Sequence, residues 1–265
     1  MELGLSGKVV LVTGGSGSLG SAMVTAFAAE GARIALTYRH DPGRAEKLAR
    51  AVEARGGEVL VVEYDLADRA SIRSAVDTVV GEWGALDVLV LNASAQQGTR
   101  TTPVAFEDVP VEHWQQALRT DVEGAFHTVQ AALPAMKGRG WGRIVLLSAN
   151  IVVRGANGDE PFIASKMALH GLGRTLATEL AADGILVNVV APGATVSDGF
   201  LRRFPDETRA TFAGLDDAGI KRVLNHGAPV GKVSTPADVA NAVLFLASGA
   251  NGNISGNVLH VAGGH

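Results

Sequence analysis

The stretch KVVLVTGGSGSLGSAMVTAFAAEG, residues 8–31, determines the fold that we expect for this chain. Residues 8–13 are rich in aliphatic side chains, and a helical pattern follows the glycine-rich turn. Gly15, Gly17 and Gly20 fit the pattern G-x-G-x-x-G. Between a strand and a helix this pattern predicts a phosphate-binding turn, because glycines let the backbone approach a pyrophosphate and the N–H groups of the helix N-terminus face it.

The same alternation of strand and helix continues along the chain. The other expected strands are 32–38, 58–64, 86–92, 143–148, 185–191 and 257–263, and helices are expected at 18–31, 45–57, 114–136 and 161–181. This pattern indicates a Rossmann-type, doubly wound parallel sheet of about seven strands with helices on both faces. The sequence contains no linker or repeat, so we expect residues 1–265 to form a single domain. Within it, the irregular segment 194–232 is expected to be an insertion that covers the substrate.

Composition excludes several classes of function. The 265 residues contain no cysteine, which excludes a disulfide framework, a thiolate metal site and a cysteine nucleophile, and no spacing of His, Asp or Glu suggests a metal site. The net charge is −4 without a basic block, so neither nucleic acid nor a membrane surface is an expected partner. The N-terminus lacks signal-peptide architecture, and no apolar run approaches the roughly 18 residues of a membrane span. A cytoplasmic location is therefore expected.

Further motifs follow the turn in a fixed order. YDLAD (64–68) contains Asp65, LNASA (91–95) contains Asn92, EPFIASKMALHG (160–171) contains Lys166, and Pro192-Gly193 follows the sixth expected strand. In this order, and over essentially its full length, the chain resembles the classical short-chain dehydrogenase/reductase family. The resemblance implies an oxidoreductase with a nicotinamide dinucleotide cofactor and a small-molecule substrate. It also implies a homodimer or homotetramer, which the small residues of helix 161–181 favour because they permit close helix packing.

The resemblance implies a cofactor site drawn from the turn, the strand ends and the helix that carries the lysine. Its residues are Gly14, Ser16, Gly17, Ser18, Leu19, Gly20, Arg39, Asp65, Leu66, Asn92, Ala93, Lys166, Pro192, Gly193, Thr195 and Ser197. Two glycines of the family pattern are replaced, one by Ser18 in the turn and one by Ser94 after the fourth strand.

The end of the second expected strand indicates the cofactor preference. NAD-binding relatives carry an acid there that holds the ribose hydroxyls, whereas this chain has Tyr38 followed by Arg39. A guanidinium suits a 2′-phosphate through charge-assisted hydrogen bonds, so NADP(H) is expected over NAD(H). Against this, Gly17 stands where many NADP-dependent relatives carry a second basic residue. The alternative role of Arg39 is that of a solvated surface charge.

The catalytic positions of the family are mostly changed in this chain. In the family, a tyrosine and a lysine four residues apart act with a serine and often an asparagine. Lys166 is kept, but the tyrosine position is Phe162. The serine position is Ala149, and the asparagine position is Asp121 in the run DVEGAF. Ser148 is expected to face away from the Ala149 position, because neighbouring residues of a strand point to opposite faces.

These changes remove the proton donor of the family's usual reaction. General acid–base catalysis is typically worth about 10²–10⁴-fold in rate, so ordinary carbonyl reduction is expected to be severely impaired. The two tyrosines of the chain, Tyr38 and Tyr64, lie at strand ends assigned to the adenosine half of the site. Lys166 then has two interpretations. It is either a catalytic residue that pairs with Asp121 or, as we favour, a grip on the ribose hydroxyls of the cofactor.

Three functions are compatible with this pattern. The one that we favour is an NADP(H)-binding oxidoreductase for a small, apolar carbonyl, enone or hydroxyl compound, with a proton relay unlike the family's. The second is a non-redox enzyme, such as a cyclase, isomerase or dehydratase, that uses the pocket as a template. The third is a catalytically silent subunit or a nucleotide-sensing regulator. Deliberate inactivation at Phe162 and Ala149 is a further alternative, but it leaves Ser18, Ser94 and Asp121 unexplained.

Overall fold

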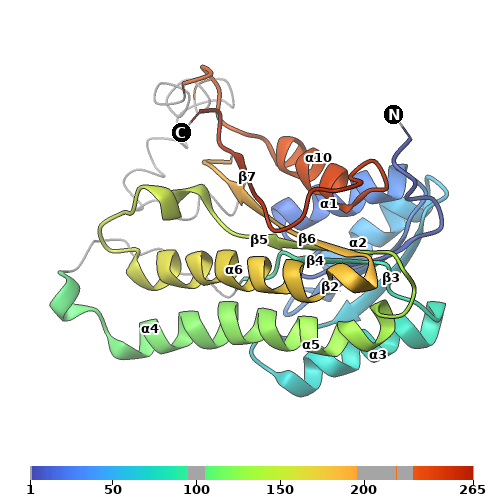
Figure 1. Ribbon diagram of the computed structural model, residues 1–265, viewed down its shortest axis with the longest axis horizontal. Helices are drawn as coiled ribbons and strands as arrows, with labels where there is room; N and C mark the ends of the chain where they lie inside the picture. Colours follow the sequence, from blue (N-terminus) through green and yellow to red (C-terminus); the bar gives the residue numbers. More distant parts are fainter. Residues whose placement is uncertain (1, 95–104, 196–218, 220–228, 265) are drawn as a thin grey trace.

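Figure 1 shows the computed structural model, which describes residues 2–94, 105–195, 219 and 229–264. Within these residues seven strands form one sheet in the order β3-β2-β1-β4-β5-β6-β7, and every neighbouring pair is parallel. The strands are β1 (Val9–Val12), β2 (Arg33–Tyr38), β3 (Glu58–Glu63), β4 (Val88–Leu91), β5 (Gly142–Leu147), β6 (Ile185–Pro192) and β7 (Val258–Val261). Each corresponds to a strand expected from the sequence, so the predicted doubly wound parallel sheet is confirmed.

Helices cover both faces of this sheet (Figure 1). They are α1 (Ser18–Ala29), α2 (Pro42–Glu53), α3 (Arg69–Trp83), α4 (Val111–Ala117), α5 (Gly124–Met136), α6 (Glu160–Glu179) and α10 (Pro236–Ala247). Side chains of α1, α2 and α10 form the core on one face, and those of α3, α5 and α6 form the core on the other. Because both faces are covered, β1, β4 and β5 are buried at every residue, which explains their nearly continuous apolar sequences.

The helix boundaries follow local capping signals. α2 begins at Pro42, earlier than expected, because the Asp41 side chain accepts a hydrogen bond from the backbone N–H of Arg44 and proline suits the first helical turn. It ends at Glu53 rather than at residue 57, ahead of Gly56, which has a positive φ of 84°. The helices predicted at 18–31 and 161–181 correspond to α1 and α6.

The prediction of one regular helix over 114–136 is wrong. α4 ends at Ala117 and α5 begins at Gly124, and the residues between them, Leu118–Glu123, form a π-helical segment. A π-helical turn contains one residue more than an α-helical turn, so it changes the direction of the side chains that it carries. Asp121 lies in this segment and is buried. The irregular segment therefore places a carboxylate inside the protein.

The order of the strands reverses between β1 and β4, and hydrogen bonds connect the ends of these two strands. The Thr13 hydroxyl accepts hydrogen bonds from the backbone N–H of Asn92 at 2.9 Å and of Ala93 at 3.0 Å. It also donates to the carbonyl oxygen of Val90. In open parallel sheets, ligands bind outside the carboxyl ends of the strands at such a reversal. The fold thus indicates where the functional site lies.

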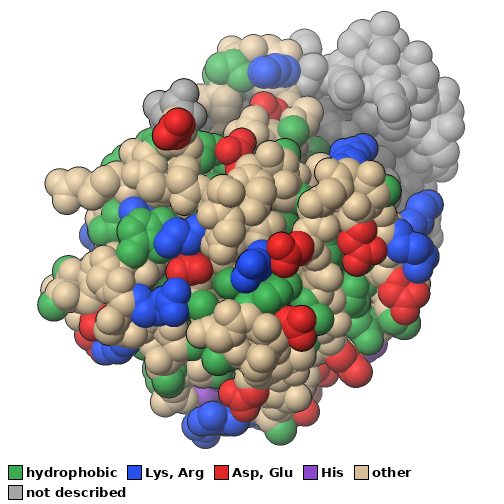
Figure 2. Space-filling view, turned by 90° about the vertical axis from the view of Figure 1, so that its right-hand side faces the viewer, with side chains coloured by type: hydrophobic (Ala, Val, Ile, Leu, Met, Phe, Trp, Pro, Cys, Tyr) green, Lys and Arg blue, Asp and Glu red, His purple; other side chains and the backbone are tan. Residues whose placement is uncertain are grey.

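Three further properties of the described residues concern membrane spans, metal clusters and surface charge. No helix among them is long and apolar enough to cross a membrane, and no group of three or more His, Asp or Glu is arranged to hold a metal ion. On the face shown in Figure 2, acidic and basic side chains are interspersed rather than gathered by sign. Most of the expected insertion 194–232, namely 196–218 and 220–228, lies outside the described residues.

Candidate functional site

A cavity of about 510 Å³ lies at the carboxyl edge of the sheet. Its walls come from the turn after β1, the ends of β2 to β6 and the first turns of α6. Every residue of the predicted cofactor site except Ser197 lines it, and Ser197 lies outside the described residues. Residues that are distant in the sequence are therefore brought to one wall, as the shared order of the motifs predicts.

The glycine-rich turn is folded tightly against itself. Gly14 has a φ of 63°, and a Cβ added at Gly20 would lie 2.2 Å from the carbonyl oxygen of Gly14. The N–H of Gly14 donates to the Thr37 hydroxyl at 2.9 Å, which joins the turn to β2. These glycines are required by the turn itself, because any side chain at Gly20 would displace the backbone.

The N-terminus of α1 opens into the cavity. Its cap residue, Gly17, makes no side-chain capping bond, and its first turn carries no acidic residue. Ser16, Ser18 and Leu19 line the cavity beside it. Uncapped backbone N–H groups and the positive end of the helix dipole favour an anion at this place. The turn thus fits a pyrophosphate, as the sequence predicts.

The ends of β2 and β3 form the far side of the cavity. The Arg39 guanidinium pairs with the Asp65 carboxylate at 3.0 Å, and the other Asp65 oxygen accepts from the N–H of Ala67. The sequence placed both residues in the cofactor site but did not predict that they pair. Arg44, in the first turn of α2, also lines the cavity and no motif had indicated it. This side of the cavity therefore carries two guanidinium groups.

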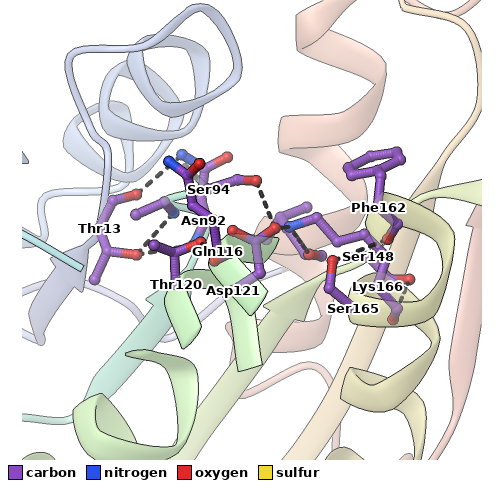
Figure 3. Close-up of polar contacts among 12 residues, drawn as sticks. Thr13, Asn92, Ser94, Gln116, Thr120, Asp121, Ser148, Phe162, Ser165 and Lys166 are labelled. Carbon is purple, nitrogen blue, oxygen red and sulfur yellow. Dashed lines mark hydrogen bonds and ion pairs between the residues drawn. The ribbon is translucent and has the colours of Figure 1, made fainter. Parts of the chain in front are cut away.

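Asn92 holds the turn in place rather than reaching across the cavity. Its side-chain amide donates to the carbonyl oxygens of Thr13 at 2.9 Å and Gly14 at 3.1 Å. The end of β4 is thereby fixed to the glycine-rich turn, as Figure 3 shows for Thr13 and Asn92.

At the other end of the cavity, Lys166 forms a buried ion pair. Its Nζ lies 3.0 Å from Oδ2 of Asp121, and the two side chains are only 6% and 3% exposed. The pairing of these two residues, one of the interpretations from sequence, is confirmed as a contact. Lys166 lines the cavity, but Asp121 is absent from the described residues that line it. Asp121 therefore lies behind Lys166 as seen from the cavity.

Ser94 is the second group in front of Asp121. Its hydroxyl donates to the same Oδ2 atom at 2.6 Å, and Ser94 itself lines the cavity. Figure 3 shows the Asp121 carboxylate between Ser94 and Lys166. The sequence indicated Ser94 only as a departure from a family glycine. The only sign in the sequence of a contact between them was that the family glycine is replaced by Ser94 in a chain that also has an acid at position 121.

The positions expected to carry the family's tyrosine and serine are apolar in this wall. Phe162 and Ala149 both line the cavity, and the Lys166 Nζ lies 5.9 Å from the centre of the Phe162 ring. The Ser148 hydroxyl donates to the backbone oxygen of Lys166 at 3.0 Å and lies 2.8 Å from Nε2 of His170. Ser148 therefore lines the same cavity as Ala149, but its hydroxyl is engaged with α6.

The two tyrosines of the chain lie at the other end. Tyr38 and Tyr64 line the cavity beside Arg39 and Asp65. The Tyr64 hydroxyl lies 2.6 Å from the Thr128 hydroxyl, and burial raises the pKa of Tyr64 well above its usual range. A phenol in this state holds its proton at neutral pH, which agrees with a packing role.

Comparisons with known proteins agree with this geometry. A family model described as enoyl-(acyl carrier protein) reductase matches residues 14–265. The 3-oxoacyl-[acyl-carrier-protein] reductase FabG of Staphylococcus aureus is 32% identical over 257 residues, which are 97% of each chain.

Two solved structures share the whole fold. A short-chain dehydrogenase from Burkholderia cenocepacia in complex with NADP has a TM-score of 0.82 at 32% identity, with 98% of each chain covered. L-sorbose reductase from Gluconobacter frateurii, complexed with NADPH and L-sorbose, has a TM-score of 0.88 at 29% identity, covering 100% of this chain and 98% of that one.

Proposed function

The chain belongs to the short-chain dehydrogenase/reductase family, and we propose that it is an NADP(H)-dependent oxidoreductase with an altered proton relay. Its substrate is a small, apolar carbonyl, enone or hydroxyl compound. The observation that carries the proposal is one cavity that joins the uncapped glycine-rich turn and Arg39 at one end to the buried Lys166–Asp121 pair at the other.

The cofactor is NADP(H) rather than NAD(H). The turn and the N-terminus of α1 hold the pyrophosphate, and Arg39, with Arg44 beside it, holds the 2′-phosphate. When bound, this cofactor supplies or accepts a hydride. The solved relatives that contain NADP or NADPH, at 32% and 29% identity, support this choice.

Lys166 has two tasks in this proposal. Its position at the cavity wall, one helical turn after Phe162, suits a grip on the ribose hydroxyls. Its ammonium is paired with Asp121. Among the described residues that line this end of the cavity, it is also the proton-bearing cation nearest to the apolar side chains of Phe162 and Ala149. In a reduction, the bound cofactor would supply the hydride to an electrophilic carbon of the substrate. The Lys166 ammonium would then give a proton to the resulting anion, directly or through water.

The missing phenol selects among substrates. A simple ketone needs a proton on its oxygen as the hydride arrives, and Phe162 and Ala149 offer none. An enone that delocalises the charge as an enolate needs less help. An activated C=C or C=O bond is therefore the substrate class that fits this wall best.

The extent of the domain and the assembly are further parts of the proposal. We take residues 1–265 as one domain, with 194–232 covering the substrate, since Thr195, near the start of this segment, lines the cavity. A homodimer or homotetramer is supported by exposed apolar side chains on the outer helices, Phe126 on α5 at 50% and Met167 on α6 at 49%.

A second candidate is a non-redox enzyme or a silent nucleotide-binding subunit. Phe162 and Ala149 favour it, because the wall that faces Lys166 lacks the family's two hydroxyls.

A titration followed by a labelled turnover distinguishes the two. NADPH binding is first measured by cofactor fluorescence, with NADH as the comparison. Small enones, quinones and ketones are then offered with NADPH that carries deuterium at C4. The proposal expects tighter binding of NADPH than NADH and transfer of deuterium to product. Binding without any label transfer or NADPH consumption would support the second candidate, and absence of NADPH binding would contradict the proposal.

A further inference from the structure

One carboxylate oxygen of Asp121 contacts two polar groups. Oδ2 lies 3.0 Å from the Lys166 ammonium and 2.6 Å from the Ser94 hydroxyl. The shorter distance is typical of a charge-assisted O–H···O⁻ hydrogen bond. The three side chains come from the loop after β4, the π-helical segment and α6, so the contact joins three separate parts of the chain.

The carboxylate has its position fixed from the cavity side. Ser94 and Lys166 line the cavity, while Asp121 lies behind them and is 3% exposed. A buried carboxylate is stable only when it is paired and hydrogen-bonded, because it has lost its water. Lys166 supplies the opposite charge, and Ser94 supplies a hydrogen bond on the same oxygen.

We propose that Ser94 is a positioning residue, which fixes the Asp121 carboxylate and thereby holds the Lys166 ammonium at the cavity wall. This inference rests on the proposed function, in which Lys166 grips the cofactor and delivers the proton. A serine that held only its own loop would bond to nearby backbone, as the Thr195 hydroxyl does with the carbonyl oxygen of Gly193. The Ser94 bond instead spans 27 residues and ends on the partner of the functional lysine.

The inference predicts coupling between the two positions. Ser94→Ala removes the hydrogen bond and lets the carboxylate turn, so the ammonium shifts with it. We expect the dissociation constant of NADPH to rise about 10-fold, the usual effect of one hydrogen bond to a charged group. In Asp121→Asn the charge that makes this bond strong is gone. Adding Ser94→Ala to that variant is then expected to have an effect of only about 2-fold.

The experiment measures NADPH binding by fluorescence and urea unfolding in one set of variants. The set contains the wild type, Ser94→Ala, Ser94→Thr, Asp121→Asn and the double variant Ser94→Ala/Asp121→Asn. Ser165→Ala is the matched control, because it removes a buried hydroxyl from α6 that bonds only the neutral backbone oxygen of Phe162 among its described contacts. Ser94→Thr keeps a hydroxyl and is expected to stay within about 2-fold of the wild type, as is Ser165→Ala.

The outcomes separate this inference from the proposed function. If the wild type binds NADPH and the effects of Ser94→Ala and Asp121→Asn multiply independently, the positioning role is wrong while the function stands. If the wild type does not bind NADPH, the proposed function fails, and the inference is then tested by the unfolding measurements alone. Ser94→Ala is expected to increase the equilibrium constant of unfolding. The inference holds only if this increase is smaller when Asp121→Asn is also present. Equal effects of Ser94→Ala and Ser165→Ala on binding would also overturn it.

Discussion

The two ends of the cavity are built by different means. The turn end is made of main chain, braced by Thr37 and Asn92, and it depends on the absence of Cβ atoms at glycines such as Gly20. The Lys166 end is made of side chains, and it depends on which group each position carries. Such a fold can keep a nucleotide-binding end while its chemical end changes, because the two ends use different kinds of interaction.

Restoring the family hydroxyls is the strongest test of this contrast. In the double variant Phe162→Tyr/Ala149→Ser, reduction of simple ketones with NADPH is expected to rise by about 10²–10⁴-fold, because a general acid returns to the cavity wall. NADPH affinity is expected to stay within about 2-fold, because the turn is untouched. Stopped-flow turnover and fluorescence titration measure the two effects. The control is Ala168→Ser, which adds a hydroxyl to α6 outside the described cavity wall. Unchanged turnover would mean that more than the relay has changed.

Removing Lys166 tests whether the chemical end also serves the cofactor. Lys166→Met leaves the Asp121 carboxylate buried without its cation, so the free energy of unfolding is expected to fall by about 3 kcal/mol. NADPH affinity is expected to fall about 100-fold, because the ribose grip is lost. Urea unfolding and titration measure these effects.

A second variant separates stability from binding. Lys166→Met/Asp121→Leu removes both charges, so it is expected to recover most of the stability but none of the affinity. Recovery of affinity in this variant would show that Lys166 matters only for folding.

A single methyl group tests the turn end. Gly20→Ala places a Cβ 2.2 Å from the carbonyl oxygen of Gly14, so the turn must shift and NADPH affinity is expected to fall by about 10-fold or more. The control is Gly81→Ala in α3, where no atom lies within 4 Å of the added Cβ. That change is expected to stabilise the protein slightly, by about 0.5–1 kcal/mol, without affecting affinity. Wild-type affinity in Gly20→Ala would show that the turn does not hold the cofactor.

Arg39, one of the two guanidinium groups proposed to hold the 2′-phosphate, provides a test of cofactor choice. Arg39→Gln is expected to weaken NADPH about 10-fold and leave NADH within about 2-fold, because only NADPH carries the 2′-phosphate. Stability is expected to change little, since the Arg39–Asp65 pair is at the surface. Arg50→Gln in α2, which loses a surface pair with Glu46, is the matched control. Equal losses for both cofactors would place Arg39 outside the 2′-phosphate site.

The smallest effect concerns pH and the α6 wall. Burial lowers the pKa of His170, and the nearby positive groups His260 and Arg174 add to this shift. The folded protein therefore binds fewer protons at this residue than the unfolded chain does. Its contribution to stability is complete above the ordinary histidine value and is lost as the pH falls below it.

Urea unfolding at about pH 7.5 and about pH 5 measures this contribution. The loss of stability between the two is expected to be smaller in His170→Asn than in the wild type. His113→Asn, on the exposed surface of α4, is the control and is expected to leave the loss unchanged. An identical loss in the wild type and in His170→Asn would assign the pH dependence to other groups.

Much of the architecture follows from local patterns. Seven apolar runs and the turn at 13–20 predicted the sheet and a phosphate-binding turn. The runs indicate the sheet because a buried parallel strand needs apolar residues on both faces. The π-helical segment at 118–123 was missed, since its hydrogen-bond pattern leaves no distinct periodicity in the sequence. The pairing of Arg39 with Asp65 was also missed, because it joins the ends of two strands.

The sheet, the glycine-rich turn and the apolar residues at positions 149 and 162 can be read from the sequence alone. Those features are properties of single residues or of residues close together in the chain. The meeting of Ser94, Asp121 and Lys166 at one carboxylate oxygen follows from the packing of the folded chain. A contact between residues 27 and 45 positions apart depends on how a loop, a π-helical segment and a helix pack, and no local pattern contains that information.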